Sequence, residues 1–252
     1  MPRFFINEEN LLPNDKICLF GDDANHISHS LRMRVGDEIT VCDFFNYEYD
    51  CEIESFTSEK VMLSVKSKHT SENEPSVSVS LFQGLPKSTK LELIIQKCTE
   101  LGISDIFPVI TSRCISRPDE RSTEKKTKRW NMISQEAAKQ AGRGHVPQVH
   151  DTFTFKNAIE QMKEYDLKFM CYELCDESFG DDLKSYLEKN LTPETKSIAF
   201  FIGPEGGISP DEAEYARENG VSFVSLGKRI LRTETAPLCV LSCIMYETDN
   251  MK

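Results

Sequence analysis

The order of apolar runs and polar turns predicts alternating strands and helices, and the pattern is clearest near the C-terminal end of the chain. Ile198–Ile202 is an unbroken apolar run of strand length, which is typical of a strand covered on both faces. A glycine-bearing turn at 203–207 follows, where missing Cβ atoms allow a ligand to approach the backbone. Ser209 and Glu212 then form the capping box of a helix. The segment therefore predicts a strand, a ligand-binding loop and a helix in succession.

The next stretch repeats the same plan. Val221–Leu226 is a second strand candidate, and the loop at 227–232 carries three cations. Thr233 or Thr235 caps a helix that reaches Tyr246 and is apolar nearly all round, so we expect it to be buried, against this chain or another subunit. Two strand-loop-helix units, with such loops at the carboxyl ends of their strands, predict a small-molecule site in an open α/β sheet.

The middle of the chain alternates in the same way. Strands are expected at 77–85, 103–110 and 167–174, and helices at 91–101, 123–141, 151–164 and 181–190. A strand, a helix and a strand in succession favour parallel pairing. We therefore expect an α/β domain over residues 73–252.

The N-terminal part is instead rich in short strand-like runs, at 17–20, 38–44, 47–56 and 60–65. These strands fit a small barrel. The segment 66–76 is polar, has few apolar anchors and contains a proline, so it is the expected linker. We therefore place a β-rich domain at residues 1–72.

Composition narrows the class of protein only modestly. The 252 residues are 39% hydrophobic and 28% charged, as in a globular protein of one or two domains. Without a secretory signal or an apolar run of membrane-spanning length, the chain is expected to be cytoplasmic and not to contact a membrane. Nine cysteines include two CxxxC pairs, Cys171 with Cys175 and Cys239 with Cys243, but we expect reduced thiols and no metal site.

The distribution of charge is more informative than its sum. The net charge of -11 argues against simple, extended binding of nucleic acid. Between Arg113 and His145, however, there are nine cations against four acids, a net of +5. This basic segment is either a docking strip for an RNA backbone or a solvated helix face with ordinary charge pairs.

Several segments together resemble one known family. GPEGGIS at 203–209 and LGKRILRTETA at 226–236 resemble the C-terminal motifs of the RsmE family, the 16S rRNA uracil-N3 methyltransferases of the SPOUT superfamily. HISHSLRMRVGDEITVCD at 26–43 is similar to the PUA-like domain of that family. LPKSTKLELIIQKCTELGI at 85–103 and RWNMISQEAAKQAGRGHVPQV at 129–149 also resemble family motifs, although Ser88 stands where the family usually has glycine.

The resemblance implies a fold and a reaction. The fold is α/β, a SPOUT-type open parallel sheet with a C-terminal trefoil knot, preceded by a small PUA-like β-barrel domain that binds RNA. The cofactor is S-adenosyl-L-methionine, and its methyl group goes to N3 of uridine 1498 of 16S rRNA, giving 3-methyluridine. The partners implied are 16S rRNA or the 30S small ribosomal subunit, and a second copy of the chain in a homodimer.

The resemblance also assigns residues to the cofactor and to the reaction. The expected cofactor site consists of the two glycine loops and the start of the last helix, namely Gly203, Pro204, Glu205, Gly206, Gly207, Leu226, Gly227, Ile230, Leu231, Thr235 and Ala236. Arg232, and after it Arg143, are the candidates for stabilising negative charge on the uracil ring. For Arg143 the alternative is a cation that complements a helix dipole. Glu234 or Glu136 is the candidate base, or else the partner of a neighbouring arginine.

The expected RNA contacts are cationic. They are Arg32, Arg34, Lys87, Arg113 and Arg229. Arg32 and Arg34 would project to the same side of an extended segment, or else pair with Asp37 and Glu38.

Three other functions remain open at this point. One is methylation of a different RNA, for example at a ribose 2'-hydroxyl of transfer RNA, as the resemblance to the wider superfamily also allows. The second is a non-catalytic RNA-binding or assembly module. The third is a phosphate-binding α/β protein that uses the 203–207 loop, although no GxxxxGK[ST] motif is present.

Overall fold

The computed structural model describes residues 1–43, 46–57, 59–115, 120–175 and 180–251. The chain divides into two compact units. Unit 1 contains residues 1–74 and 138–146, and unit 2 contains residues 75–137 and 147–252. The end of helix α3 (Glu120–Ala141) therefore counts with the N-terminal unit. The domain boundary drawn from the sequence after residue 72 stays a prediction.

Unit 1 is built around one six-stranded, mostly antiparallel sheet in the order β1-β4-β5-β6-β3-β2. Its elements are β1 (Arg3–Phe5), the 3-10 turn η1 (Glu8–Asn10), β2 (Leu11–Leu12), β3 (Lys16–Phe20), α1 (Asp22–Asn25), the π-helical turn η2 (His26–Ser30), β4 (Glu38–Cys42), β5 (Tyr47–Phe56) and β6 (Lys60–Thr70). Period-two alternation in β5 buries Tyr49, Cys51 and Ile53 in the core of this unit. Among the described residues β1 and β2 do not pair, so the hydrogen-bonded order is an open path.

Strand β6 extends beyond the predicted end at Val65. It continues to Thr70, so the first half of the expected linker is in fact strand. Its polar residues pair with β5, Thr70 opposite Tyr47 and Lys68 opposite Tyr49. The Lys68 ammonium lies 4.1 Å from the centre of the Tyr47 ring, a favourable cation-π distance. A polar composition therefore concealed a strand whose side chains face solvent.

Unit 2 is a parallel sheet with helices on both faces. Its strands, in the order β10-β8-β7-β13-β11-β14-β12 with β9 beside β8, are β7 (Ser78–Gly84), β8 (Asp105–Ile110), β9 (Gln148–Val149), β10 (Phe153–Thr154), β11 (Leu167–Cys171), β12 (Asp181–Asp182), β13 (Ser197–Ile202) and β14 (Ser222–Ser225). Besides α3, its helices are α2 (Lys90–Glu100), α4 (Phe155–Met162), α5 (Leu183–Asn190), α6 (Pro210–Glu218) and α7 (Ala236–Glu247). The predicted parallel α/β sheet is confirmed.

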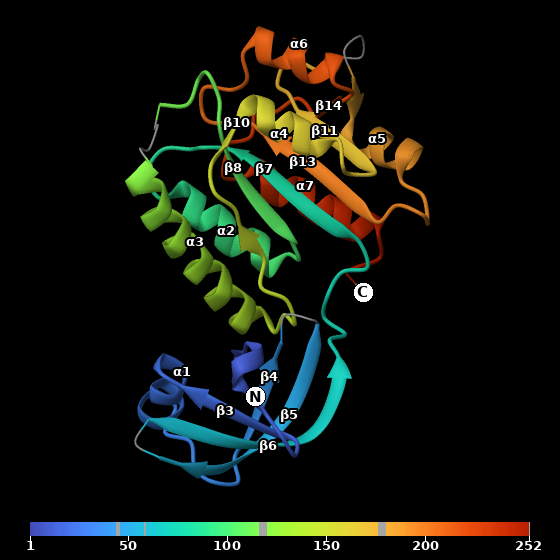
Figure 1. Cartoon of the computed structure of the whole chain (residues 1–252). Helices are drawn as coiled ribbons and strands as arrows, with labels where there is room; N and C mark the ends of the chain where they lie inside the picture. The colour runs from blue at the N-terminus through green and yellow to red at the C-terminus, as the bar shows by residue number, and fades with distance from the viewer. Residues whose placement is uncertain (44–45, 58, 116–119, 176–179, 252) are drawn as a thin grey trace. The chain divides into compact units, whose positions relative to one another are not determined.

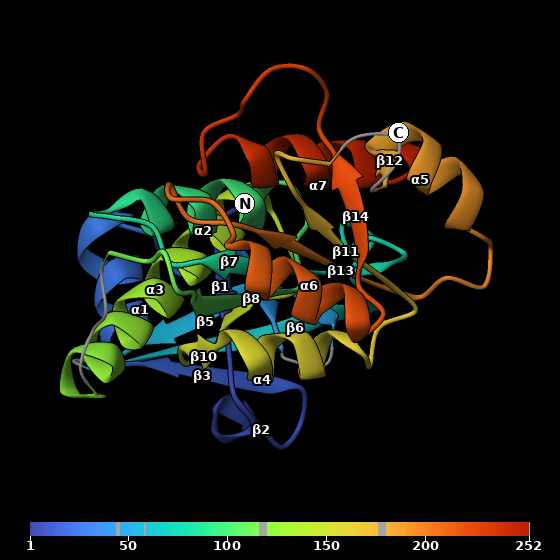
Figure 2. The same cartoon turned by 90° about the horizontal axis from the view of Figure 1, so that it is seen from above.

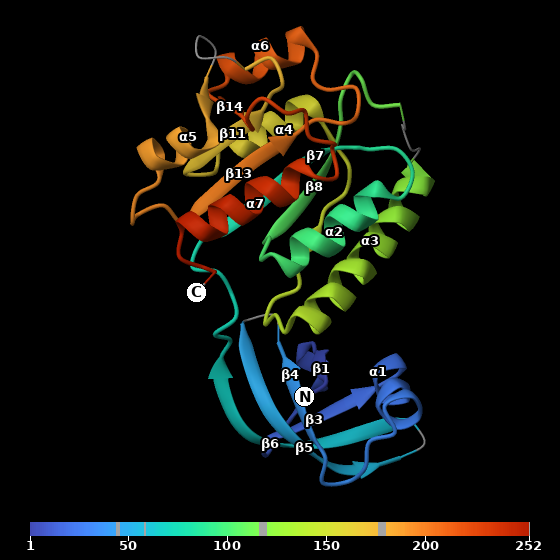
Figure 3. The same ribbon diagram turned by 180° about the vertical axis from the view of Figure 1, so that it is seen from behind.

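Two hydrophobic clusters separate the layers of unit 2. One cluster joins one face of the sheet to α2, α3, α5 and α7, and the other joins the opposite face to α4 and α6. Successive residues of β13 alternate between them, since Phe200 belongs to the first and Phe201 to the second. Figure 1 and Figure 2 show the sheet between the two helical layers, and Figure 3 shows α2, α3 and α7 over its near face.

The strand register brings four loops to one edge of the sheet. Ile202 at the end of β13 lies opposite both Gln83 of β7 and Cys171 of β11, and Cys171 lies opposite Val224 of β14. Because all these strands are parallel, their carboxyl ends meet at the same edge, where ligands bind in open α/β sheets. The glycine loops after β13 and β14 are therefore neighbours.

The helix ends agree with the sequence pattern at most positions. The capping box of Ser209 with Glu212 is formed at the start of α6, so that prediction is confirmed. Thr235 occupies the cap position of α7, but its side chain makes no capping hydrogen bond. Within the described residues, no helix combines the length and the apolar character needed to cross a bilayer.

Candidate functional site

A pocket of about 830 Å³ opens at this edge of the sheet. Its wall consists mainly of the loops after β11, β13 and β14, together with residues at the starts of α2, α5 and α7. The lining residues are Lys90, Cys171–Glu173, Cys175, Gly180–Asp182, Ile202–Glu205, Gly207, Ile208, Ser225–Thr233 and Ala236. A volume of this size is typical of a site for a drug-sized or cofactor-sized molecule.

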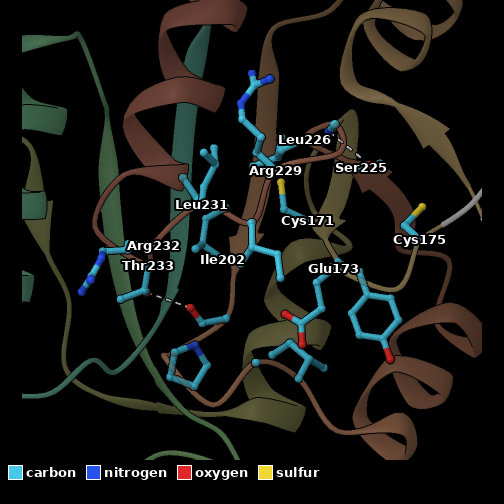
Figure 4. A pocket seen from close by; sticks show the side chains of 18 of the residues that line it. Cys171, Glu173, Cys175, Ile202, Ser225, Leu226, Arg229, Leu231, Arg232 and Thr233 are labelled. Carbon is cyan, nitrogen blue, oxygen red and sulfur yellow. Dashed lines mark hydrogen bonds between the residues drawn. The ribbon is translucent and has the colours of Figure 1, made fainter.

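The loop after β13 depends on glycine at Gly207. Its φ is +68°, a left-handed conformation that favours glycine, and its N-H donates to the Pro204 carbonyl at 2.9 Å. A Cβ at this position would lie 2.5 Å from a carboxylate oxygen of Glu173. Any side chain here would therefore be strained and would displace Glu173, which Figure 4 shows directed toward this loop.

The loop after β14 is exposed and cationic. Lys228, Arg229 and Arg232 are exposed, and Ile230 is 90% exposed. Within the described part of the chain, the Arg229 and Arg232 side chains make no hydrogen bond and no ion pair. Figure 4 shows that the Arg229 and Arg232 side chains extend away from the Glu173 carboxylate. These two arginines therefore keep their full hydrogen-bonding capacity for a ligand.

Lys90 connects the two loops electrostatically. Its ammonium group lies 3.0 Å from Glu205 and 3.2 Å from Glu234. Burial raises the pKa of Glu205, but backbone hydrogen bonds and Lys90 outweigh burial, so the net pKa is below its ordinary value. A backbone hydrogen bond and then Lys90 also hold the pKa of Glu234 below its usual range. Both carboxylates are therefore ionised at neutral pH. The ion-pair partner of Glu234 is Lys90, and the charge of Arg232 adds a smaller electrostatic attraction that also lowers the pKa of Glu234.

A buried hydrogen-bond chain also reaches both loops. The amide nitrogen of Gln83 donates to the Thr233 hydroxyl at 3.0 Å, and this hydroxyl donates to the Gly203 carbonyl at 2.8 Å. Gln83 is fully buried and Thr233 is 7% exposed. Thr233 is therefore not the cap of α7; its hydroxyl is directed into the site instead.

The pocket also contains Glu173, a carboxylate to which sequence reasoning assigned no role and which has no counter-ion among the described residues. The other lining acids are engaged: Glu205 with Lys90, Asp181 with Lys189 and Asp182 with the first turn of α5. Among the described residues, Glu173 makes no hydrogen bond or ion pair. The end of the predicted strand and the family resemblance indicated that Glu173 lies near this wall, and the strand register places it at the same edge as the glycine loops.

The two CxxxC pairs have different surroundings. Cys171 and Cys175 line the pocket, and burial raises the pKa of the Cys171 thiol, so it remains protonated and acts as a small apolar wall. Cys239 is exposed on α7 and Cys243 is half-buried. The Cys239 side chain is therefore not part of the hydrophobic core of unit 2. None of the nine cysteines forms a disulfide with another described residue.

The structure places most of the expected cofactor residues together. The expected cofactor residues that line the pocket are Gly203, Pro204, Glu205, Gly207, Leu226, Gly227, Ile230, Leu231 and Ala236. Arg229 and Arg232 line it as well. Gly206, Thr235 and Glu234 are not among the described lining residues. Gly206 instead accepts a hydrogen bond from the Arg113 side chain at 3.1 Å, and the Lys87 N-H donates to Glu205 at 3.2 Å. The loops that carry Lys87 and Arg113 thus support the glycine loop.

Arg143 has different surroundings. It is 3% exposed, and its guanidinium binds Glu74 through two nitrogens, with the Nε to Oε1 distance at 3.2 Å. The same carboxylate accepts from the N-H groups of Gly144 and His145. Arg143 is not among the described residues that line the pocket. This geometry favours a structural role for Arg143 within unit 1, and its catalytic role stays a prediction.

The predicted RNA contacts of unit 1 are exposed. Arg32 has a φ of +53°, so the segment is not extended there and the expected placement of Arg32 and Arg34 on one side does not follow. Asp37 accepts from the Arg34 backbone N-H at 2.7 Å, and no ion pair of either arginine is found among the described residues. In the basic segment, Arg117 and Asp119 lie outside the described residues. Elsewhere in that segment, Arg129 pairs with Glu92 and Lys128 with Glu124.

Comparison with protein families gives matches over most of the chain. Residues 72–245 match the model of an RNA methyltransferase domain, and residues 14–65 match that of an RNA methyltransferase PUA domain. A ribosomal RNA small subunit methyltransferase E of Bacillus subtilis is 35% identical over 254 residues, covering 100% of this chain and 99% of the relative. One of Mesomycoplasma hyopneumoniae is 31% identical over 97% of this chain and 99% of the relative.

A solved structure shares the same fold. The crystal structure of a ribosomal RNA small subunit methyltransferase E from Neisseria gonorrhoeae, bound to S-adenosyl methionine, superposes with a TM-score of 0.82. The two chains are 30% identical, and the match covers 98% of this chain and 97% of that chain.

Proposed function

Because the chain belongs to the ribosomal RNA small subunit methyltransferase E family, we propose that it transfers the methyl group of S-adenosylmethionine to N3 of a uridine in 16S rRNA. The product is 3-methyluridine, and the expected target is uridine 1498. The observation that carries the proposal is the pocket between the two glycine loops, which Arg229 and Arg232 line with guanidinium groups that make no ion pair with the described residues.

The walls of the pocket fit S-adenosylmethionine. Ile202, Ile208, Leu226 and Leu231 supply apolar surface for a planar adenine, and the glycine loops supply backbone N-H and C=O groups. The unpaired Glu173 carboxylate offers an acceptor for the hydroxyl or cationic groups of such a molecule. When bound, the cofactor provides an activated methyl group on a sulfonium, so the protein has to position a nucleophile and stabilise its charge.

Arg232 is the proposed residue for that charge. Loss of the N3 proton leaves negative charge on the uracil ring and its oxygens, and an unpaired guanidinium at the pocket stabilises such a charge through paired donors. Arg229 on the same loop is the proposed RNA contact. Glu234 is a weak candidate for the base, because the lowered pKa of its carboxyl makes it a poorer proton acceptor.

The substrate is proposed to be unpaired or strained RNA, since N3 of uracil is buried in a base pair. The exposed cations Arg32 and Arg34 of unit 1, with Lys87 and Arg113 in unit 2, are the proposed contacts to the phosphate backbone. The match of residues 14–65 to a PUA domain of RNA methyltransferases supports this role for unit 1. Binding to 16S rRNA or the 30S subunit would place the protein in the cytoplasm.

We also infer a homodimer and a C-terminal trefoil knot. The exposed apolar surface of the last loop and helix supports the dimer: Ile230 is 90% exposed and Tyr246 is 71% exposed. Light scattering at micromolar concentration should give twice the 28.8 kDa mass of one chain. The strand order supports the knot, because β13 and β14 lie on opposite sides of β11. The chain therefore crosses β11 between its two glycine loops.

A test of the reaction uses small subunits from a strain that lacks the gene. The purified protein is incubated with these subunits and S-adenosylmethionine, and the nucleosides of the 16S rRNA are measured by mass spectrometry. We expect one 3-methyluridine per subunit, absent from a reaction without the protein. Naked 16S rRNA as a parallel substrate shows whether the assembled subunit is required.

Other products would identify the competing functions. A methyl group on a ribose 2'-hydroxyl, or methylation of transfer RNA in place of 16S rRNA, would contradict the proposed specificity. Calorimetry that detects no binding of S-adenosylmethionine would contradict the proposal as a whole and favour a non-catalytic RNA-binding module.

A further inference from the structure

We infer that Thr233 is a positioning residue that fixes the two glycine loops of the cofactor pocket relative to each other, and that Gln83 sets the direction of its hydroxyl group. This inference rests on the proposed function in so far as the pocket holds S-adenosylmethionine. It assigns a role to two buried polar side chains. The sequence offered Thr233 only as a possible helix cap, a position that Thr235 occupies, and it offered no role for Gln83, the penultimate residue of β7.

The direction of the hydrogen bonds is fixed at one end by a backbone carbonyl. The Gln83 amide nitrogen lies 3.0 Å from the Gly84 carbonyl oxygen and 3.0 Å from the Thr233 hydroxyl. The opposite orientation of the amide would set two acceptor oxygens, those of Gln83 and Gly84, against each other. The amide therefore donates to both groups. The Thr233 hydroxyl, having accepted this bond, is left to donate its only proton to Gly203 at 2.8 Å.

Burial makes this arrangement costly to break. Gln83 is fully buried, and none of the described protein groups donates to its carbonyl oxygen. Both protons of the Gln83 amide are used within the protein, one on Gly84 and one on Thr233. Loss of either bond would leave a buried donor or acceptor without its protein partner, which is destabilising. The Gln83 amide is therefore held in the orientation that donates to the Thr233 hydroxyl.

The end of β7 is shaped for the same contact. A Cβ on Gly84 would lie 2.5 Å from the Pro204 side chain and 2.6 Å from the Pro204 nitrogen. Glycine therefore lets the Gly203–Pro204 peptide lie directly against the end of β7. Gln83 and Gly84, adjacent in the sequence, thus hold one loop through a hydrogen bond and the other through close packing.

The consequence concerns both walls of the pocket. Gly203 belongs to the loop after β13, and Thr233 lies between Arg232 and Glu234 at the end of the loop after β14. The Thr233 hydroxyl is the one described side chain that hydrogen-bonds directly from the second loop to the first. Removing it frees the Gly203 carbonyl to turn and loosens the segment that carries Arg232. The pocket then has to order both loops when the cofactor binds, which lowers affinity.

The test compares Thr233→Val with Thr233→Ser. Valine keeps the shape of threonine without its hydroxyl, whereas serine keeps the hydroxyl. By calorimetry, we expect the valine variant to bind S-adenosylmethionine about tenfold more weakly, as the loss of one buried hydrogen bond implies, and the serine variant to bind within about twofold of the wild type. In turnover, the valine variant should show a raised KM for the cofactor with kcat nearly unchanged, the pattern of lost ground-state binding.

Two further variants guard against a purely structural explanation. Thr248→Val removes a hydroxyl that donates to the Ile244 carbonyl at 2.7 Å at the end of α7, and it should leave cofactor affinity unchanged. Gln83→Leu removes the group that orients Thr233 and should weaken binding about threefold. This variant decides the question if Thr233→Val does not fold.

The outcomes separate the two proposals. Wild-type affinity in Thr233→Val, or equal losses in Thr233→Val and Thr233→Ser, would overturn the positioning role. A fall in the unfolding temperature of Thr233→Val with unchanged cofactor affinity would also overturn it. If the wild type itself bound no S-adenosylmethionine, the proposed function would fail before the role of Thr233 was tested.

Discussion

Arg143 and Arg232 are both predicted to stabilise charge on a substrate, yet the structure gives their guanidinium groups opposite surroundings. Arg143 is buried in unit 1 and donates to both oxygens of Glu74. Arg232 is exposed on a loop of unit 2 and lines the pocket, and its guanidinium makes no hydrogen bond or ion pair with the described residues. One guanidinium is used by the fold, and the other remains available to a ligand.

The difference shows what burial adds to a sequence motif. Both arginines lie next to an element boundary, Arg143 after Gly142 at the end of α3 and Arg232 before the start of α7. In each case the sequence is compatible with a structural or a functional role. The accessibility of the guanidinium and the identity of its partner distinguish the roles, and neither can be read from the local sequence.

The largest expected effect on stability is that of Arg143→Ala. It leaves the Glu74 carboxylate without its counter-ion in a mostly buried site, so the free energy of unfolding should fall by about 3 kcal/mol. Urea unfolding measures the change, and Arg143→Ala combined with Glu74→Ala should recover part of it. If the single variant unfolded like the wild type but lost turnover, Arg143 would belong with Arg232 and the contrast would disappear.

The largest expected effect on the reaction is that of Arg232→Ala. Loss of one charge-stabilising donor should lower kcat about 100-fold, with cofactor affinity and unfolding temperature close to those of the wild type. Arg217→Ala on α6 is the matched control, because Arg217 is an exposed arginine that pairs with Glu214. A variant with normal kcat would show that the unpaired guanidinium is not used in the reaction.

Two glycines extend the comparison to the backbone. Gly142 and Gly207 have nearly the same φ, +70° and +68°, so alanine is strained at either position. At Gly142 the nearest atom to an added Cβ is 3.9 Å away, but at Gly207 the Glu173 carboxylate is 2.5 Å away. Calorimetry should therefore show cofactor affinity reduced about tenfold in Gly207→Ala, from roughly 1–2 kcal/mol of strain and displacement. Gly142→Ala should lose only stability, and equal affinities would contradict this distinction.

The smallest expected effect is a pH dependence from Lys90. Its partners Glu205 and Glu234 have lowered pKa values in the folded protein, so their ion pairs stabilise the fold above the ordinary carboxyl pKa of 4.5. This stabilisation is lost as the pH falls through the lowered values. The unfolding temperature of Lys90→Met should thus lie below that of the wild type at pH 7 and converge with it in acid. A constant difference at all pH values would exclude the ion pairs as its cause.

The sequence predicted the architecture of unit 2 well, because its signals are local. The apolar run of β13, the capping box of α6 and the glycine after α2 each depend on a few adjacent residues. Ser88, which stands where the family usually has glycine, has a φ of +56°. This left-handed conformation favours glycine, so it explains the usual residue at this turn. The extension of β6 was missed because β5 supplies its pairing partner and solvent faces its side chains.

The candidate site was predicted less completely, because it depends on pairing between distant strands. The two glycine loops were found from composition and resemblance. The resemblance also placed Glu173 near the pocket wall, but its position against the glycine loop depends on the register of β11 with β13. Gln83 and Thr233 meet across 150 positions of sequence, so no local pattern indicates their hydrogen bond. The burial of Arg143 depends likewise on Glu74, which is 69 positions away.

The position of β13 has a consequence for biosynthesis. This strand lies between β7 and β11 in the sheet, although it follows both in the chain. During translation, β7 and β11 emerge from the ribosome without the neighbour that later separates them, and they must wait for residues 197–202. A polypeptide stopped before this point would expose unpaired edges of two apolar strands. We therefore expect the sheet of unit 2 to form only after β13 has been synthesised, and chains terminated before β13 to aggregate.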